Sequence, residues 1–171
     1  MAPPGLATRP ISDRAKEAIF NMLIGLGGLA DAEVIDLYAG SGSFGIECLS
    51  RGARRVTFVE RARPAIAAIE ANLDRLGFAD RAVVSPLSVE AALGALAPVD
   101  VAFCDPPYAL DPWPALLPRI QARLLVGHAE TPVALSAEWT ELRRRRYGRA
   151  NIVIAARAET GLDGESSTPH D

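Results

Sequence analysis

The stretch EVIDLYAGSGSFG, residues 33–45, decides the fold class. It begins as a short apolar run, which is consistent with a buried strand. Gly40, Gly42 and Gly45 follow in the spacing G-x-G-x-x-G, and Glu60 lies at the end of the next apolar run. Glycines let a ligand approach the backbone, and an acid at that place accepts hydrogen bonds from ribose hydroxyls. The stretch therefore predicts a strand, loop and helix that bind an adenosine-containing cofactor.

The loop alone serves a dinucleotide and S-adenosylmethionine equally well. Asp36, near the end of the first strand, favours S-adenosylmethionine, because an acid there suits a cationic amino-acid moiety better than a pyrophosphate. A tight turn without a ligand is the plainest alternative, and a dinucleotide-dependent oxidoreductase is another. The oxidoreductase would need a hydride-transfer site, for which the sequence offers no candidate. We expect S-adenosylmethionine as the cofactor.

Short apolar runs alternate with longer helical patterns along the rest of the chain. Strands are predicted at 33–38, 55–60, 82–85, 99–104, 132–136, 142–147 and 151–157. Helices are predicted at 12–25, 43–52, 64–76, 89–96 and 113–125. This alternation implies a doubly wound parallel sheet, to which a closing hairpin adds an antiparallel strand. We expect an α/β, Rossmann-like fold, with a mostly parallel seven-stranded sheet, an antiparallel C-terminal hairpin strand and helices on both faces.

The composition fits one domain, residues 1–158, followed by an acidic tail, 159–171. The tail holds four acids and no Lys or Arg, and it is too polar to bury surface, so we expect it to be disordered. The rest of the chain carries 18 basic and 17 acidic residues, so the net charge of −3 does not exclude a nucleic-acid partner. The chain has no long apolar run and does not begin like a signal peptide, which favours a cytoplasmic protein.

A second motif, Asp105-Pro106-Pro107-Tyr108, directly follows the predicted strand 99–104. Ligands bind at this edge of open α/β sheets. The prolines hold the backbone extended and lack N–H donors, so their carbonyls stand as acceptors beside the Asp105 carboxylate. Tyr108 adds a flat apolar face. A proline-rich turn is the plain alternative, which the upstream glycine loop disfavours.

This set of groups suits the exocyclic amino group of a nucleic-acid base. Such an amine is a poor nucleophile, because its lone pair is delocalised into the ring. Acceptors that hold its hydrogens turn the lone pair toward a methyl donor and stabilise the charge that develops. Tyr108 can stack on a base removed from its own stack. The two motifs together predict methyl transfer from S-adenosylmethionine by a single in-line displacement.

The tetrad resembles that of class I methyltransferases that act on amino groups of adenine, cytosine and guanine. More narrowly, the chain resembles the RsmD family in segments that follow one another along nearly its whole length. These are Thr8–Arg14, Glu17–Leu23, Asp36–Gly42, Val59–Arg61 and Arg146–Gly148. The resemblance implies a class I methyltransferase fold. It also implies methylation of the N2 amino group of a guanine in 16S rRNA, within a small ribosomal subunit or an assembly intermediate.

The resemblance also implies which residues form the site. The catalytic set is Asp105, Pro106 and Tyr108. The cofactor set is Asp36, Ala39, Gly40, Ser41, Gly42, Glu60, Arg61, Leu87 and Ser88. Leu87 and Ser88 would flank the adenine, where many class I enzymes have an acid. The substrate set is Pro107 and Tyr108, to which Arg9 and Arg14 are added because they lie next to the expected active edge.

The resemblance has one gap, at the N-terminus. Family members usually start with a basic segment before a Pro-Pro-Gly, which here falls at residues 3–5. A natural short form and a truncated chain both fit, and we favour truncation, with weaker RNA binding and an intact cofactor site.

The arginine groups allow two interpretations. The run Arg143–Arg146 with Arg149 suits RNA phosphates, and a strand edge protected from aggregation by charge explains it equally well. Arg51, Arg54 and Arg55 are expected to lie in a solvated turn.

The remaining reactive side chains predict packing rather than chemistry. Cys48 and Cys104 are expected in the core, and His128 on the surface after a helix. Two cysteines and two distant histidines make no metal-ligand set, and a monomer is the default. A DNA methyltransferase for adenine N6 or cytosine N4 stays open, although the chain lacks a target-recognition module. A non-catalytic module with the same fold is a further alternative.

Overall fold

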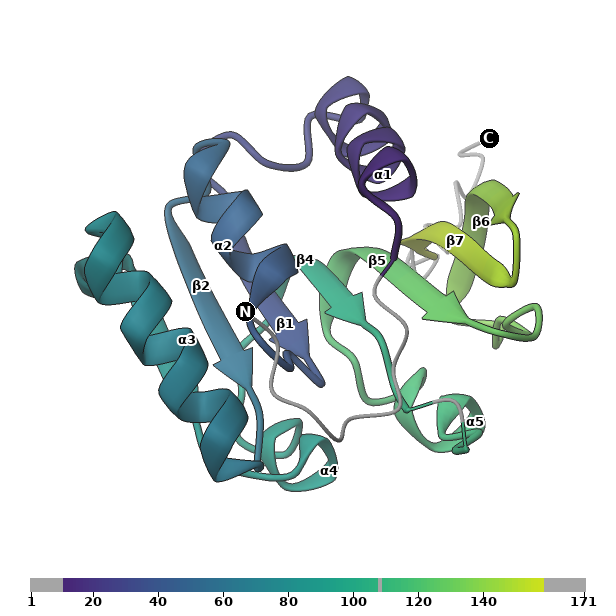
Figure 1. Cartoon of the computed structure of the whole chain (residues 1–171). Coiled ribbons are helices and arrows are strands. Elements are labelled where there is room, and N and C mark those ends of the chain that lie inside the picture. The colour runs from purple at the N-terminus through teal and green to yellow at the C-terminus, as the bar shows by residue number, and fades with distance from the viewer. Residues whose placement is uncertain (1–10, 108, 159–171) are drawn as a thin grey trace, which may run out of the picture.

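The computed structural model describes residues 11–107 and 109–158, in which one mixed sheet forms the centre (Figure 1). Its strands are β1 (Glu33–Leu37), β2 (Arg55–Val59), β3 (Ala82–Ser85), β4 (Val99–Cys104), β5 (Ala122–Ala129), β6 (Trp139–Tyr147) and β7 (Ala150–Arg157). They pair in the order β3-β2-β1-β4-β5-β7-β6. β7 is antiparallel to β5 and β6, and the other pairs are parallel. The predicted seven-stranded, Rossmann-like sheet with an antiparallel hairpin strand is confirmed.

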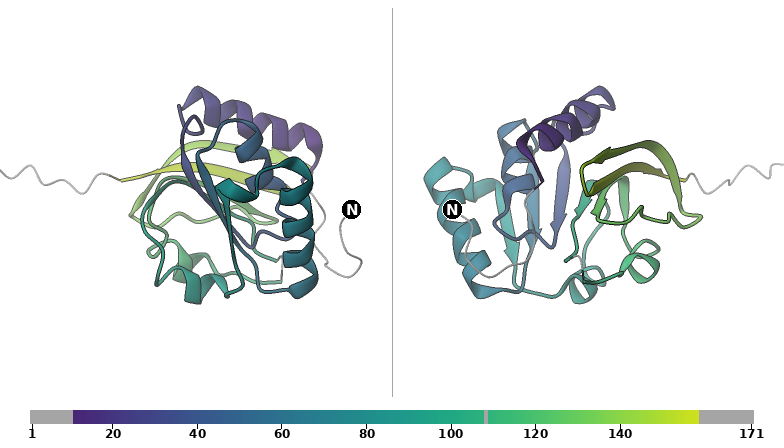
Figure 2. Two further views of the ribbon diagram at one scale, coloured as in Figure 1. Left: turned by 90° about the vertical axis from the view of Figure 1, so that its left-hand side faces the viewer. Right: turned by 45° about the vertical axis from the view of Figure 1, so that its right-hand side comes forward.

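Helices cover both faces of the sheet, as predicted (Figure 2). α1 (Asp13–Gly25), α2 (Ser43–Ser50) and α3 (Arg63–Leu76) pack into one hydrophobic cluster. The short helices α4 (Val89–Ala92) and α5 (Trp113–Leu116) pack into a second cluster. Strand side chains alternate between the clusters, as the pleat requires. In the described parts of the chain, no helix is long and apolar enough to cross a membrane.

α1 begins where its capping residue predicts. Ser12 Oγ accepts a hydrogen bond from Ala15 N at 3.3 Å. The buried face of the helix is Ala15, Ile19, Phe20 and Leu23, an apolar stripe at helical spacing. The Phe20 ring lies 5.8 Å from that of Phe103 in β4. Burial of each large side chain contributes roughly 1.5–3 kcal/mol and anchors α1 on the sheet.

The predicted helix 113–125 is wrong in its second half. α5 ends at Leu116, and β5 begins six residues later. β5 is a central strand buried on both faces. The sequence of such a strand is a continuous apolar run. The spacing of its apolar residues does not distinguish it from a buried helix. Pro118 also lacks the N–H that would extend α5.

One predicted strand is absent, and two element boundaries differ from the prediction by three residues or more. The predicted strand 132–136 is an irregular connection between β5 and β6. β6 begins at Trp139 rather than at 142, and α4 ends at Ala92 rather than at 96. The predicted disordered tail, 159–171, lies outside the described residues.

Gly45 lets α2 lie directly against β2. A Cβ atom at this position would stand 2.2 Å from Phe58 Cε1 and 2.8 Å from Val56 Cγ1. Packed interiors do not allow such approaches, so a larger residue would push the helix away from the strand. Gly42 precedes α2 with φ of 79°, a left-handed conformation that glycine adopts readily. The glycine spacing thus reflects one tight turn and one close approach.

Asp36, near the end of β1, stabilises the turn between β1 and α2. Its side chain is buried, and Oδ2 accepts a hydrogen bond from Gly45 N at 2.9 Å. Burial raises the pKa of Asp36 to about 8, and the Asp105 and Glu60 carboxylates act in the same direction. The bond from Gly45 favours the ionised form without offsetting the burial. β1 and the first turn of α2 are therefore joined through a buried carboxyl group.

Replacing Gly45 by alanine is expected to destabilise the fold by roughly 1–3 kcal/mol, because the added methyl group overpacks the contact with Phe58. The matched control is Gly25→Ala at the end of α1, where a Cβ meets no atom within 4 Å. Its stability should stay the same or rise slightly. Urea unfolding followed by circular dichroism measures both. Equal midpoints for Gly45→Ala and the unmutated protein would contradict the close approach.

A second prediction concerns the pH dependence of stability. Asp36 ionises at about 3.8 in the unfolded chain and at about 8 in the folded one. Between these values the unfolded state releases its proton first, so a rise in pH favours unfolding through this group. Asp36→Asn removes the titration. We compare the free energy of unfolding of Asp36→Asn with that of the unmutated protein at each pH. Between about pH 5 and about pH 9 this difference should shift in favour of Asp36→Asn by at least about 1.4 kcal/mol, a tenfold change in the folding equilibrium constant.

The control for this measurement is Asp74→Asn, on the exposed face of α3. Its stability difference from the unmutated protein should not change with pH in this way. A pH-independent difference for Asp36→Asn as well would show that the buried carboxyl is not held neutral.

Candidate active site

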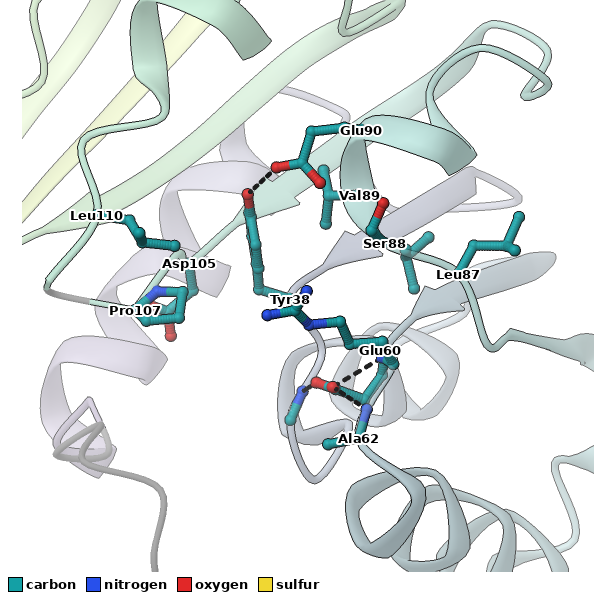
Figure 3. A pocket seen from close by; sticks show the side chains of 13 residues that line it. Tyr38, Glu60, Ala62, Leu87, Ser88, Val89, Glu90, Asp105, Pro107 and Leu110 are labelled. Atoms are coloured by element: carbon teal, nitrogen blue, oxygen red, sulfur yellow. Dashed lines mark hydrogen bonds between the residues drawn. The ribbon is translucent and has the colours of Figure 1, made fainter.

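A cavity of about 420 Å³ opens at the carboxyl ends of β1 to β4 (Figure 3). Its lining comes from four loops: residues 38 and 40 after β1, 59–62 at the end of β2, 87–90 after β3, and 105, 107 and 110 after β4. Open α/β sheets bind ligands at these strand ends, and the volume suits a small-molecule cofactor. The glycine loop therefore meets Asp105 and Pro107 of the Asp-Pro-Pro-Tyr tetrad at one site.

Glu60 connects the loop after β1 to the start of α3. Its Oε2 accepts a hydrogen bond from Gly40 N at 2.9 Å. Its Oε1 accepts from Arg61 N and Ala62 N, both at 2.8 Å. Three backbone donors thus fix the orientation of the carboxylate at the cavity wall (Figure 3). Each carboxylate oxygen has two lone pairs, so acceptor capacity remains for a ligand hydroxyl.

Tyr38 and Glu90 are neighbours on the cavity wall. Neither was predicted as a site residue from the sequence. Tyr38 has φ of 58°, which costs on the order of 1–2 kcal/mol for a residue with a side chain. Its hydroxyl donates to Glu90 Oε1 at 3.3 Å (Figure 3). Burial and the Glu90 carboxylate raise the pKa of Tyr38, so the hydroxyl stays a donor. The backbone N–H of Glu90, followed by the Ser88 hydroxyl, lowers the pKa of Glu90.

Glu90 is an acid beside the predicted adenine position. It lines the same cavity as Leu87 and Ser88, at the carboxyl end of β3. Glu90 was assigned from the sequence to a helix from 89 to 96. Its position two residues after Ser88 was the one sequence feature that pointed to the site.

The predicted cofactor residues divide into two groups. Those at the cavity wall are Gly40, Glu60, Arg61, Leu87 and Ser88. The others shape the loop behind it. Asp36 is buried against α2, and Gly42 N donates to Ala39 O at 2.8 Å to close the turn that contains Ser41.

The tetrad meets the cavity through Asp105 and Pro107. Asp105 directly follows β4, and 27% of its side chain is exposed. Arg14 is exposed in the first turn of α1. Tyr108 and Arg9 lie outside the described residues, so their predicted roles stay predictions.

The prediction of His128 as a surface residue is wrong. His128 lies in β5, is 3% exposed, and places Nδ1 2.7 Å from Asp105 Oδ1. The error follows from the misassigned helix, which put this residue in a loop. Sequence reasoning therefore missed a direct partner of the tetrad carboxylate.

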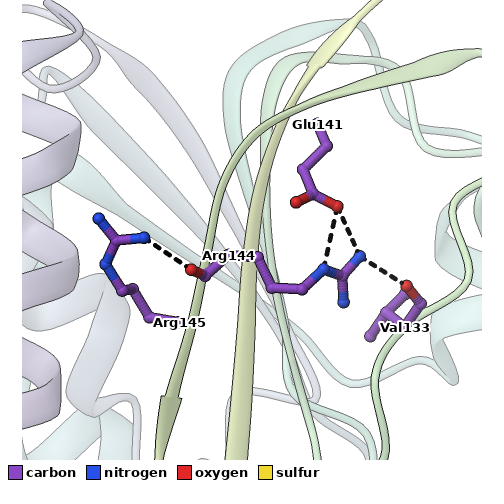
Figure 4. A network of polar contacts seen from close by, with 4 residues as sticks. All are labelled: Val133, Glu141, Arg144 and Arg145. Carbon is purple, nitrogen blue, oxygen red and sulfur yellow. Dashed lines mark hydrogen bonds and ion pairs between the residues drawn. The ribbon is translucent and has the colours of Figure 1, made fainter.

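The arginine run lies on β6, at the edge of the sheet. Arg144 donates two hydrogen bonds to Glu141 Oε2, at 2.8 and 2.9 Å, and one to Val133 O at 3.0 Å (Figure 4). Arg143 and Arg145 are exposed and donate to backbone carbonyls of the same strand. Arg146 is also exposed, and Arg149 pairs with Glu130 at 2.9 Å, so the run contains both tethered and more accessible guanidinium groups.

The other arginine group is only partly a solvated turn. Arg54 and Arg55 are exposed, as expected. Arg51 instead pairs with Glu47 at 2.7 Å and lies 4.9 Å from the centroid of the Phe20 ring.

Cys48 and Cys104 are buried and free, as predicted. Burial raises the pKa of both thiols, which keeps them out of nucleophilic chemistry. Within residues 11–107 and 109–158, no three His, Cys, Asp or Glu side chains gather to hold a metal ion.

The chain is similar in sequence to known proteins. A family model described as "Conserved hypothetical protein 95" matches residues 1–156. The chain is 41% identical over 165 residues to a Bacillus subtilis protein named "Putative rRNA methyltransferase YlbH", covering 88% of each. It is 35% identical over 105 residues to the Escherichia coli protein named "Ribosomal RNA small subunit methyltransferase D", covering 61% of this chain and 51% of that protein.

A solved structure agrees with the sequence comparisons. It is named "Putative methyltransferase yhhF from Escherichia coli" and has a TM-score of 0.79 and 29% identity, covering 91% of this chain and 90% of that one. The family model spans most of the chain, including both motifs that line the cavity. The chain therefore belongs to the family described as "Conserved hypothetical protein 95" and is an RsmD-like methyltransferase.

Proposed function

We propose that this chain transfers a methyl group from S-adenosylmethionine to the exocyclic N2 amino group of a guanine in 16S rRNA. The observation that carries the proposal is that Asp105 and Pro107 open onto the same cavity as Gly40 and Glu60. A motif that holds amines and a motif that binds adenosine thereby share one site. The names of the B. subtilis and E. coli relatives support ribosomal RNA as the substrate. The family resemblance supports guanine N2 in the small subunit. A cytoplasmic location and a monomer are kept as expectations from the sequence.

The side chains around the cavity fit the cofactor. Glu60 has lone pairs left for the ribose hydroxyls, and Leu87 offers exposed apolar surface to the adenine. The Glu90 carboxylate and the Ser88 hydroxyl are acceptors beside Leu87. Asp36 acts indirectly, by holding the loop through Gly45. When bound, S-adenosylmethionine supplies an electrophilic methyl group on a sulfonium sulfur.

Asp105 and the Pro106 carbonyl are the proposed acceptors for the two hydrogens of the guanine amine. Holding both hydrogens directs the nitrogen lone pair toward the methyl carbon and stabilises the charge that develops. As the nitrogen–carbon bond forms, the carbon–sulfur bond breaks and the amine releases one proton, which the Asp105 carboxylate can accept. Tyr108 is proposed to stack on the guanine, a role that rests on the motif.

The RNA is proposed to lie along the carboxyl edge of the sheet, toward the β6–β7 hairpin. β6 runs in the same direction as β5, because both are antiparallel to β7. The register places Arg145 opposite Ile152, and Ile152 opposite His128. Arg145 is therefore level with His128, next to the edge that carries the cavity, whereas Arg143 lies two residues further from that edge. Guanidinium groups match phosphate oxygens in shape and charge.

Glu60→Ala is expected to weaken S-adenosylmethionine binding at least tenfold, about 1.4 kcal/mol, because it removes the ribose acceptor and releases Gly40. Glu60→Gln keeps one oxygen acceptor and should bind with intermediate affinity. Isothermal titration calorimetry measures both, with Glu70→Ala on the exposed face of α3 as the control. If Glu60→Ala bound S-adenosylmethionine as tightly as the unmutated protein, the cofactor would not bind at Glu60.

Asp105→Ala is expected to lower kcat by about 100- to 1000-fold, the usual effect of losing one preorganised group, and to leave cofactor affinity intact. The measurement is transfer of a labelled methyl group to small ribosomal subunits, free 16S rRNA or duplex DNA. Asp111→Ala, an exposed acid just beyond the tetrad, is the control. If only DNA became labelled, the protein would be a DNA methyltransferase. If Asp105→Ala kept full activity, the tetrad would not be the catalytic centre.

A further inference from the structure

Asp105 and His128 stand side by side because their strands run in register. β4 and β5 pair in parallel with Cys104 opposite Gly127, so Asp105 and His128 are the next residues on each strand. Paired residues on neighbouring strands point to the same face. The distance of 2.7 Å between Nδ1 and Oδ1 is typical of a charge-assisted hydrogen bond. The imidazole is buried, whereas part of the Asp105 side chain is exposed at the cavity.

The chain around Asp105 cannot orient this carboxylate in the way that Glu60 is oriented. Glu60 is held by the backbone N–H groups of the next two residues, Arg61 and Ala62. The two residues after Asp105 are prolines, which have no backbone N–H. A carboxylate at this place needs a donor from another element of the fold. His128, on the adjacent strand, is in position to be that donor.

A carboxylate that holds an amine must accept hydrogen bonds, so a contact with His128 that serves this purpose requires a proton on Nδ1 of the imidazole. We infer that His128 is a positioning residue, which holds Oδ1 of Asp105 and leaves the remaining acceptor sites of the carboxylate for the substrate amine. The inference rests on the proposed function, because it concerns how the same site grips its substrate. His128 acts through Asp105, and its buried position keeps that contact away from competing water.

Two replacements separate this role from simple packing. His128→Leu keeps most of the bulk and removes the donor, whereas His128→Asn keeps an N–H donor near the place of Nδ1. His128→Leu should lower kcat about 10- to 100-fold, the effect of a misplaced reacting group. The KM and the calorimetric affinity for S-adenosylmethionine should stay unchanged. His128→Asn should restore most of kcat.

The assay is steady-state methyl transfer to small ribosomal subunits, with thermal unfolding of each variant measured in parallel. Full kcat in His128→Leu would overturn the inference and leave the proposed function intact. Equal losses of kcat in both variants, in step with lower thermal stability, would indicate packing and would also overturn it.

A spectroscopic measurement reports the contact without turnover. In isotope-labelled protein, the proton on Nδ1 of His128 should give a resonance shifted downfield by the bond to Asp105. Asp105→Ala should abolish that shift. An unshifted resonance in the unmutated protein would overturn the inference.

Failure of the proposed function gives a different result. The unmutated protein would then bind S-adenosylmethionine but transfer no methyl group to RNA. The resonance would still decide whether His128 holds Asp105.

Discussion

At Gly45, α2 lies against β2 with no side chain between them, because Phe58 and Val56 occupy the space that a Cβ would need. The same glycine donates its N–H to the buried Asp36, so the end of β1 and the start of α2 are tied together over nine residues. The chain between them turns through left-handed conformations at Tyr38, Gly40 and Gly42. This forced turn brings Gly40 N–H to Glu60 and places Tyr38 at the cavity wall.

Glu60 and Asp105 both line the cavity, and the protein orients their carboxylates in different ways. Glu60 is held largely by the backbone that follows it, so its geometry is a local property of the β2–α3 connection. Asp105 is followed by prolines and takes its partner from the neighbouring strand. The geometry of the proposed cofactor residue Glu60 is therefore set largely by local signals. That of the proposed substrate residue Asp105 depends on the pairing of β4 with β5.

Features that local chemistry specifies could be predicted from the sequence. Ser12 and Gly77 mark helix ends by capping, and the predicted strands 82–85 and 99–104 coincide with β3 and β4. β5 could not be predicted, because a strand buried on both faces shows no alternation. That error moved His128 into a loop and hid its bond to Asp105. Glu90 was missed because a single helical turn was taken for a longer helix.

Mass analysis of ribosomal RNA nucleosides is the most direct test that this site methylates an exocyclic amine. Small ribosomal subunits from cells that lack the activity would be incubated with the protein and S-adenosylmethionine. We predict one new N2-methylguanosine, at a single position of 16S rRNA. A new methyl group on a ring nitrogen, a ring carbon or a ribose oxygen would contradict the account, because Asp105 and the Pro106 carbonyl are proposed to hold the hydrogens of an amino group.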